Sequence, residues 1–202
     1  MEIVCLDLEG VLVPEIWIAF AEKTGIMELM RTTRDDPDYE KLMAWIMDVL
    51  RSHGLTLSDI QDTISQIHPL EGAYEFLSKL RSITQVVILS DTFKEFASPL
   101  MKQLGWPTIL CNSLVIDENN MLCGMKLRQV DGKRKAIEGF RSMGFRTFAA
   151  GDSYNDLSMI HTADKGCLFR APENILKEEP DLKLCTTYDE FYSVIESFVK
   201  ED

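Results

Sequence analysis

Short apolar runs alternate with amphipathic segments along most of this chain of 202 residues. The runs occupy residues 3–6, 86–89, 108–111, 147–150 and 167–169, and turn-forming or polar residues follow each of them. Amphipathic segments such as 73–81, 93–104 and 134–143 separate them. Strands that alternate with helices predict an α/β fold, here a three-layer, doubly wound and mostly parallel Rossmann-like sheet covered by helices on both faces.

Two segments depart from simple alternation. Residues 113–116 and 121–127 flank the polar sequence DENN and predict a β-hairpin. At the other end of the chain, residues 189–199 predict a final helix, with Phe191, Ile195 and Phe198 on one face.

The stretch from residue 14 to residue 69 is helical throughout, with helices expected at 15–24, 38–52 and 57–67. The third of these begins with Thr56 and carries Asp59 three residues later, a pattern typical of a capping box. Such an insert directly after the first strand predicts a small helical cap over the strand ends. We therefore expect an α/β core made of residues 1–13 and 70–202, and a cap made of residues 14–69.

The chain is acidic, with 21 lysines and arginines against 33 aspartates and glutamates and a net charge of −12. This charge argues against nucleic acid or an anionic membrane as a partner. No run reaches transmembrane length, and acids near the first residue exclude a signal peptide. The five cysteines are scattered and lack CxxC spacing, which favours free thiols and a cytoplasmic protein. They are Cys5, Cys111, Cys123, Cys167 and Cys185.

Two carboxylates, Asp7 and Glu9, follow the first apolar run within the sequence DLEGV at residues 7–11. Alternation along a strand directs both side chains the same way, and like charges this close need a cation or a shared proton. A second acidic group, Asp152 and Asp156, follows the run at 147–150. Alone it is more typical of a helix cap, but if the two strands are neighbours the four acids converge. Oxygen donors without histidine or thiolate favour a hard cation, Mg²⁺.

Two further groups can neutralise an anion near these acids. Ser90 and Asp91 follow the run at 86–89. Backbone N–H groups at a strand-to-helix junction can hold an anion. A helix N-cap is, however, the simpler interpretation of Ser90. Lys133 begins a basic triplet at residues 133–135. Such a triplet usually lies on the solvated surface, but the ammonium group of Lys133 can also reach the acids. A carboxylate nucleophile, a divalent cation, an anion cradle and a lysine fit phosphoryl transfer through an aspartyl-phosphate.

These four motifs, in this order, resemble those of the haloacid dehalogenase-like phosphatase superfamily over essentially the whole chain. Within it, the chain is most similar to phosphoserine phosphatases, and in particular to the branch that also transfers phosphate from phosphoserine to homoserine and shares the DLEG opening. The resemblance implies a Mg²⁺-dependent phosphomonoesterase that acts on a small phosphorylated metabolite. It also implies a homodimer.

The resemblance implies roles for individual residues. Asp7 is the nucleophile and a metal ligand, and Glu9 is the general acid and base and also binds the metal through its main-chain carbonyl. Asp152 is the third metal ligand, and Asp156 supports Asp152 without binding the metal itself. The remaining assignments concern the substrate: Ser90, Asp91, Lys133 and Asn155 lie around the phosphoryl group, and Glu15 meets an ammonium group. A first-turn acid favoured by the helix dipole is the alternative for Glu15.

Two features differ from most relatives. The acid at position 9 is glutamate where aspartate is usual, a change that the homoserine branch shares. The second cap helix also lacks the arginine that clasps a substrate carboxylate, because the sequence around Ile46 is AWIM. Arg51 lies more than a turn away, and Arg31 and Arg34 precede the helix.

Other functions on this fold remain as alternatives. A phosphatase for another small metabolite needs the same motifs. A dehalogenase does not require the acids at 152 and 156, and a receiver-like module that only stores phosphate lacks a cap. A degenerate scaffold protein would not need the full set of motifs.

Overall fold

The computed structural model describes residues 1–31 and 39–201. Strands and helices alternate along the chain as expected. In chain order they are β1 (Glu2–Leu6), α1 (Ile16–Thr24), η1 (Met27–Met30), α2 (Tyr39–Ser52), α3 (Leu57–Ser65), α4 (Ala73–Arg81), β2 (Gln85–Phe93), α5 (Lys94–Gln103), β3 (Thr108–Ile116), β4 (Leu122–Lys126), α6 (Gly132–Ser142), β5 (Arg146–Gly151), η2 (Tyr154–Asp156), α7 (Leu157–Thr162), β6 (Lys165–Phe169), α8 (Glu173–Glu178), β7 (Leu184–Cys185) and α9 (Tyr188–Lys200).

The strands form one sheet in the order β4-β3-β2-β1-β5-β6-β7. All neighbours pair in parallel except β3 and β4, which form the expected antiparallel hairpin. From β1 the chain moves outward through β2 and β3, and it later returns to β5 on the other side of β1. The winding direction therefore reverses at β1, and ligands of doubly wound sheets bind at such a reversal, beyond the carboxyl ends of the strands.

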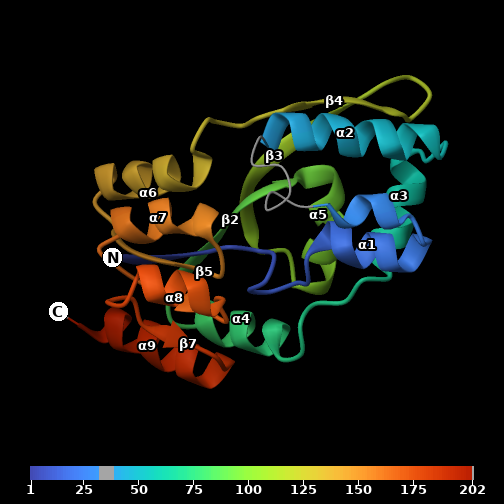
Figure 1. Cartoon of the computed structure of the whole chain (residues 1–202). Coiled ribbons are helices and arrows are strands. Elements are labelled where there is room, and N and C mark those ends of the chain that lie inside the picture. The colour runs from blue at the N-terminus through green and yellow to red at the C-terminus, as the bar shows by residue number, and fades with distance from the viewer. Residues whose placement is uncertain (32–38, 202) are drawn as a thin grey trace.

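Helices cover both faces of the sheet, which confirms the predicted three-layer α/β architecture. In Figure 1, α6 and α7 lie over one face and α4 and α9 lie under the other. Alternate residues of β1 serve the two faces, because Val4 and Leu6 join one buried cluster while Ile3 and Cys5 join the other. The predicted final helix is present as α9, and its stripe of Phe191, Ile195 and Phe198 is buried against the sheet.

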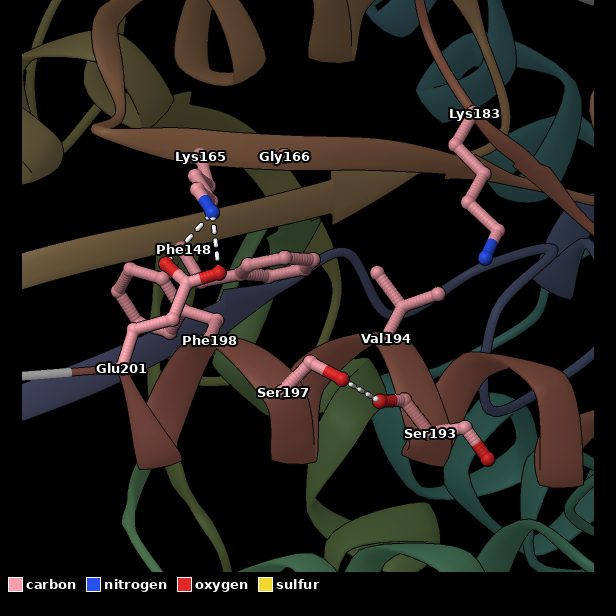
Figure 2. A pocket seen from close by; sticks show the side chains of 9 residues that line it. All are labelled: Phe148, Lys165, Gly166, Lys183, Ser193, Val194, Ser197, Phe198 and Glu201. Atoms are coloured by element: carbon pink, nitrogen blue, oxygen red, sulfur yellow. Dashed lines mark hydrogen bonds and ion pairs between the residues drawn. The ribbon is translucent and has the colours of Figure 1, made fainter.

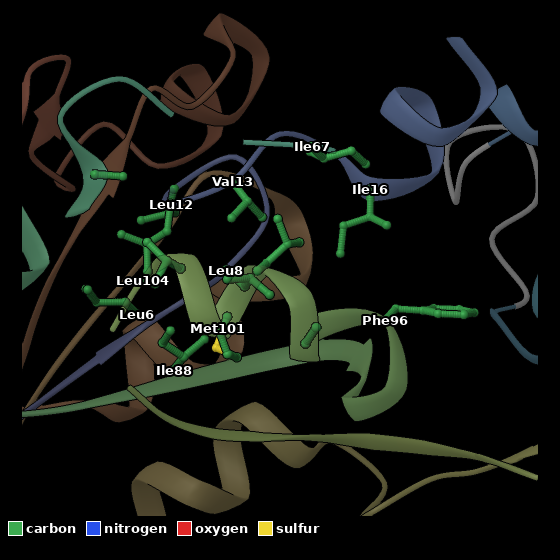
Figure 3. Packing of buried hydrophobic residues seen from close by; sticks show 14 of the residues in the cluster. Leu6, Leu8, Leu12, Val13, Ile16, Ile67, Ile88, Phe96, Met101 and Leu104 are labelled. Carbon is green, nitrogen blue, oxygen red and sulfur yellow. The ribbon is translucent and has the colours of Figure 1, made fainter. Parts of the chain in front are cut away.

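Helices α1, α2 and α3 lie beyond the carboxyl ends of the strands and share a hydrophobic core with the sheet. A single buried cluster runs from Leu6 and Ile88 on the strands to Ile16 on α1 and Phe96 on α5 (Figure 3). The hairpin also holds α2, because the Arg51 guanidinium donates to the Leu122 carbonyl at 2.8 Å. The helical segment is therefore packed against the rest of the chain.

Helix boundaries agree closely with the sequence. The capping box of α3 forms, since Thr56 accepts from the Asp59 amide and Asp59 accepts from the Thr56 amide. The expected start of α2 at Asp38 lies outside the described residues, as does Arg34.

The structure also contains elements that the sequence did not predict. β3 is one strand where the sequence suggested two apolar segments. Asn112, between these segments, is buried and donates to the Asp91 carbonyl on the neighbouring strand β2. Helices α7 and α8 and the short β7 were not predicted either.

All five cysteines are free thiols, as expected. Within residues 1–31 and 39–201, no helix combines the length and the apolar character needed to cross a bilayer.

Candidate active site

The predicted site residues meet at the carboxyl ends of three adjacent strands. β1 is hydrogen-bonded to β5 on one side and to β2 on the other. Asp7 follows β1, Asp152 follows β5, and Ser90 lies in the last part of β2. All three line a cavity of about 540 Å³ that extends under the helical segment. Its size suits a small metabolite.

Glycine is required at two points of this site. Gly10 has φ +72°, in the left-handed region, and a Cβ there would lie 2.3 Å from Oδ2 of Asp152. A Cβ at Gly151 would lie 2.1 Å from Cγ of Asp156. Gly10 therefore allows the two acidic segments to approach each other, and Gly151 allows the Asp156 side chain to fold back against the end of β5.

Lys133 binds the acids together at the floor of the cavity. Its Nζ lies 2.9 Å from Oδ1 of Asp7, 2.7 Å from Oδ1 of Asp156 and 3.8 Å from Oδ2 of Asp91. Lys133 is 4% exposed and Asp156 is fully buried, so little water screens these contacts. Of the basic triplet that opens α6, this lysine alone is buried, while Arg134 pairs with Asp131 and Glu138.

The charges of this cluster are strongly coupled. Burial disfavours the ammonium form of Lys133, but the carboxylates of Asp156 and Asp7 outweigh it and raise the pKa of Lys133 well above its ordinary value. Burial, together with repulsion from Asp156, raises the pKa of Asp7 well above its ordinary value, although Lys133 acts in the opposite direction. A cation beside Asp7 would favour its ionised form.

Glu9 connects the strand end to the helical segment. Its Oε2 accepts a hydrogen bond from the Ile16 amide at 2.9 Å, so Glu9 caps α1 from a distance. Burial and the neighbouring Glu15 carboxylate raise the pKa of Glu9 to about 8. A carboxyl group with that pKa holds a proton at neutral pH, as a general acid must. Glu15 occupies the N-cap position of α1 without capping it, and its exposed side chain lines the cavity.

Asp152 and Asp156 occupy the turn after β5 and have different surroundings. Both backbone amides of Asp152 and Ser153 donate to Oδ2 of Asp156 at 3.1 Å, so Lys133 and these amides engage both of its oxygens. Asp152 instead faces the cavity. Burial, then repulsion from Asp156 and Glu15, raises the pKa of Asp152 to about 7.

Ser90, Asp91 and Asn155 complete the rim near Lys133. Ser90 is buried within β2 and its Oγ accepts from the Thr92 amide at 3.2 Å, so the simpler interpretation of Ser90 as a helix cap is wrong. Helix α5 begins later, after Phe93. Asn155 donates to Oδ2 of Asp91 at 3.0 Å.

The sequence did not predict one wall of the cavity. Tyr154, Asn174 and Ile175 line it, and the Tyr154 hydroxyl donates to Glu178 at 2.7 Å and accepts from Asn174 at 3.1 Å. Helix α8 supplies Asn174 and Ile175 because the crossover from β6 to β7 returns to the same edge of the sheet. No local pattern in residues 172–178 indicates this position.

The donor atoms fit a hard divalent cation. Oxygens of Asp7, Asp152 and Asp156 lie within 4.8 Å of one another. The cavity lining contains no histidine or cysteine among the residues that the structure describes. Both carboxylate oxygens of Asp156 already accept hydrogen bonds from Lys133 and the backbone, so Asp7 and Asp152 are the carboxylates that could bind a cation. Coordination by oxygen atoms alone is typical of Mg²⁺.

A second cavity of about 350 Å³ lies between α9 and β6, away from these acids (Figure 2). The Lys165 ammonium is paired there with the Glu201 carboxylate at 2.6 Å. The remaining lining is apolar or hydroxylic apart from Lys183, so this cavity offers no cluster of metal ligands among the described residues.

The profile of the haloacid dehalogenase-like hydrolases matches residues 17–161. The chain belongs to this family. It is 57% identical over 190 residues to phosphoserine phosphatase ThrH of Pseudomonas aeruginosa, an alignment that covers 94% of this chain and 93% of that protein. It is also 57% identical over 190 residues to a phosphoserine phosphatase of Pseudomonas syringae pv. tomato, covering 94% of this chain and 80% of that protein.

Solved structures of phosphoserine phosphatases share the fold. A substrate-bound phosphoserine phosphatase complex superposes with a TM-score of 0.75 at 20% identity, covering 93% of each chain. A phosphoserine phosphatase in apo form superposes with a TM-score of 0.73 at 22% identity, covering 91% of this chain and 92% of that one. These likenesses confirm the α/β fold of the family.

Proposed function

We propose that this protein is a Mg²⁺-dependent phosphomonoester hydrolase that forms an aspartyl-phosphate on Asp7, and that its substrate is phosphoserine. The observation that carries the proposal is the pairing of Asp7 with Lys133 on the floor of a small cavity, in a chain 57% identical to a phosphoserine phosphatase. The donor set beside Asp7 agrees with a hydrolase that uses a hard cation.

In the first half of the proposed reaction, a carboxylate oxygen of Asp7 attacks phosphorus and the bond from phosphorus to the serine oxygen breaks. Glu9 gives its proton to that oxygen, which its pKa of about 8 allows at neutral pH. Lys133 neutralises charge on the phosphoryl group while it holds Asp7 in place. Ser90 and Asn155 contribute hydrogen bonds to the phosphoryl oxygens.

In the second half, Glu9 accepts a proton from water, the water oxygen attacks phosphorus, and the bond between phosphorus and Asp7 breaks. Mg²⁺, held by Asp7, Asp152 and the main-chain carbonyl of Glu9, would supply positive charge that stabilises the phosphoryl group. Asp156 keeps Lys133 and the turn at Asp152 in position through the contacts described above.

An alcohol can replace water in the second half. We propose homoserine as this acceptor, since its hydroxyl would meet the same general base, Glu9. The exposed Glu15 carboxylate on the cavity wall would meet the ammonium group of either amino acid.

Residues 14–69 act in this proposal as a cap that closes the cavity over the core of residues 1–13 and 70–202. Their helices contribute Trp17, Ile18, Leu42 and Met43 to the lining. We further propose a cytoplasmic homodimer. Size-exclusion chromatography with light scattering tests the dimer.

The function is tested by incubating the purified protein with phosphoserine, p-nitrophenyl phosphate and a panel of phosphorylated metabolites, with Mg²⁺ or with a chelator. We expect Mg²⁺-dependent phosphate release, with phosphoserine among the best substrates. Addition of homoserine should yield phosphohomoserine. Activity on p-nitrophenyl phosphate without activity on phosphoserine would remove the substrate assignment and leave the chemistry in place.

A further inference from the structure

Asp91 places a carboxylate among the groups that hold the phosphoryl group in the proposed reaction. It lies in the last part of β2, next to Ser90, and its side chain lines the cavity and is 44% exposed. The Asn112 side chain holds the strand at this point by donating to the Asp91 carbonyl at 2.9 Å. An acid here requires a physical account, because a phosphoryl group is itself an anion and like charges repel.

One oxygen of Asp91 faces two of the donors that the phosphoryl oxygens require. Its Oδ2 accepts a hydrogen bond from Nδ2 of Asn155 at 3.0 Å. The same oxygen lies 3.8 Å from Nζ of Lys133. A single carboxylate oxygen therefore lies against both nitrogen atoms that the proposed reaction assigns to the phosphoryl group.

Lys133 has little donor capacity left for a phosphoryl oxygen. An ammonium group carries three N–H donors. Oδ1 of Asp7 and Oδ1 of Asp156 use two of them, at 2.9 and 2.7 Å from Nζ. Among the residues that the structure describes, Asp91 is the next carboxylate to Nζ. The phosphoryl group and Asp91 therefore require the same remaining N–H group.

We propose that Asp91 competes with phosphate for Lys133 and Asn155, and that it thereby weakens the binding of inorganic phosphate and favours its release after each turnover. This inference rests on the proposed function and deepens it by assigning the residue that limits inhibition by the product. An ionised carboxylate is an acceptor only, so Asp91 cannot itself donate to a phosphoryl oxygen. Because it acts through Lys133 and Asn155, Asp91 is a positioning residue.

The competition acts on inorganic phosphate and on a phosphate ester alike, because both offer the same phosphoryl oxygens. Its removal is a change in uniform binding, which lowers KM for the ester and Ki for phosphate together without raising kcat. Phosphate that binds more tightly also leaves more slowly, so kcat falls where product release limits turnover.

The test measures the affinity for inorganic phosphate directly. Phosphate is titrated into the protein with Mg²⁺ by isothermal titration calorimetry, and its Ki is measured against p-nitrophenyl phosphate hydrolysis. Asp91→Ala should lower both Kd and Ki roughly 10-fold, since one hydrogen bond to a charged group no longer has to be broken. Asp91→Asn removes the charge at nearly constant shape and should lower both constants as well, which separates the effect from a change in volume.

Asp62→Asn is the matched control, because Asp62 is an exposed acid on α3 outside the cavity lining and its loss changes the net charge equally. We expect it to change the Kd of phosphate by less than about 2-fold, because salt screens charges on the distant surface. A damaged site binds phosphate less tightly, so the expected gain in affinity cannot result from a loss of structure.

The role of Asp91 and the proposed function fail on different results. If either Asp91 variant binds phosphate no more tightly than the unmodified protein, or if Asp62→Asn gains as much, the role of Asp91 is overturned while phosphatase activity stands. If the unmodified protein hydrolyses neither phosphoserine nor p-nitrophenyl phosphate, the proposed function is overturned, and the role of Asp91 with it.

Discussion

Replacing Asp152 with asparagine should make the metal-free protein more stable at alkaline pH and remove most of its stabilisation by Mg²⁺. Burial and the repulsion from Asp156 and Glu15 raise the pKa of Asp152 from 3.8 to about 7, so its ionised form destabilises the folded state. Asparagine has nearly the same shape and no charge. The substitution therefore removes the repulsion without opening a cavity.

The sign and size follow from proton linkage. Between pH 3.8 and about 7 the folded protein keeps a proton on Asp152 that the unfolded chain has released, so stability falls as the pH rises through this range. A pKa difference of about three corresponds to about 4 kcal/mol. Because the Asp152 side chain has partial contact with water, we reduce this to about 2 kcal/mol at pH 8. For a chain of this size the expected increase in Tm is about 4 to 8 °C.

Thermal unfolding of metal-free protein at pH 5.5 and pH 8 measures the effect. The advantage of Asp152→Asn should be largest at pH 8 and about half as large at pH 5.5. Millimolar Mg²⁺ should raise the Tm of the unmodified protein at pH 8 and leave that of the variant almost unchanged. Asp62→Asn, on the exposed surface of α3, is the control and should show neither effect. A variant that is less stable than the unmodified protein at pH 8 without metal, yet gains as much from Mg²⁺, would refute this reasoning.

Three further predictions concern chemistry and stability. Asp7→Asn should lower turnover of p-nitrophenyl phosphate by at least about 10³-fold, since amide oxygen is a poor nucleophile. Phe191→Ala should lower the free energy of unfolding by about 3–5 kcal/mol in urea denaturation. The reason is that the Phe191 ring stacks on Phe169 at 4.7 Å and on Phe76 at 5.0 Å within the core. Thr56→Ala should lower it by about 1 kcal/mol, because the capping box of α3 is lost.

Two controls accompany these predictions, one for turnover and one for stability. The Asp7→Asn variant should have a Tm equal to or above that of the unmodified protein, so that a loss of turnover cannot be attributed to unfolding. Activity near the original level would show that Asp7 is not the nucleophile. Met143→Ala, at a side chain that is 64% exposed, should change the free energy of unfolding by less than about 0.5 kcal/mol. A loss at Phe191 no larger than that at Met143 would contradict the packing argument.

The order of strands and helices was predictable because it depends on local periodicity. The apolar runs at 3–6 and 147–150 lie within β1 and β5, and α4 spans the segment expected from its amphipathic pattern. The two acidic motifs were also recognisable, since each follows a strand directly. Sequence alone left open whether those strands were neighbours.

Tertiary packing decided the rest. In isolation Ser90 suggested a helix cap and the triplet at 133–135 suggested solvated surface. The start of α6 turns Lys133 inward, to a position 2.9 Å from Asp7, and β2 continues through Ser90. A short stretch of sequence does not show which polar residues become buried. Burial brings these residues together as a charged cluster.

The chain by itself therefore determined which chemical groups stand at the strand ends, because strand periodicity and turn residues are encoded within a few positions. The fold alone decided which of those groups meet. Asp7 and Lys133 are far apart in the sequence, and so are Arg31 and Tyr154, which line one cavity. Their proximity depends on the reversal of winding at β1 and on helices packed over it, and both are properties of the whole molecule.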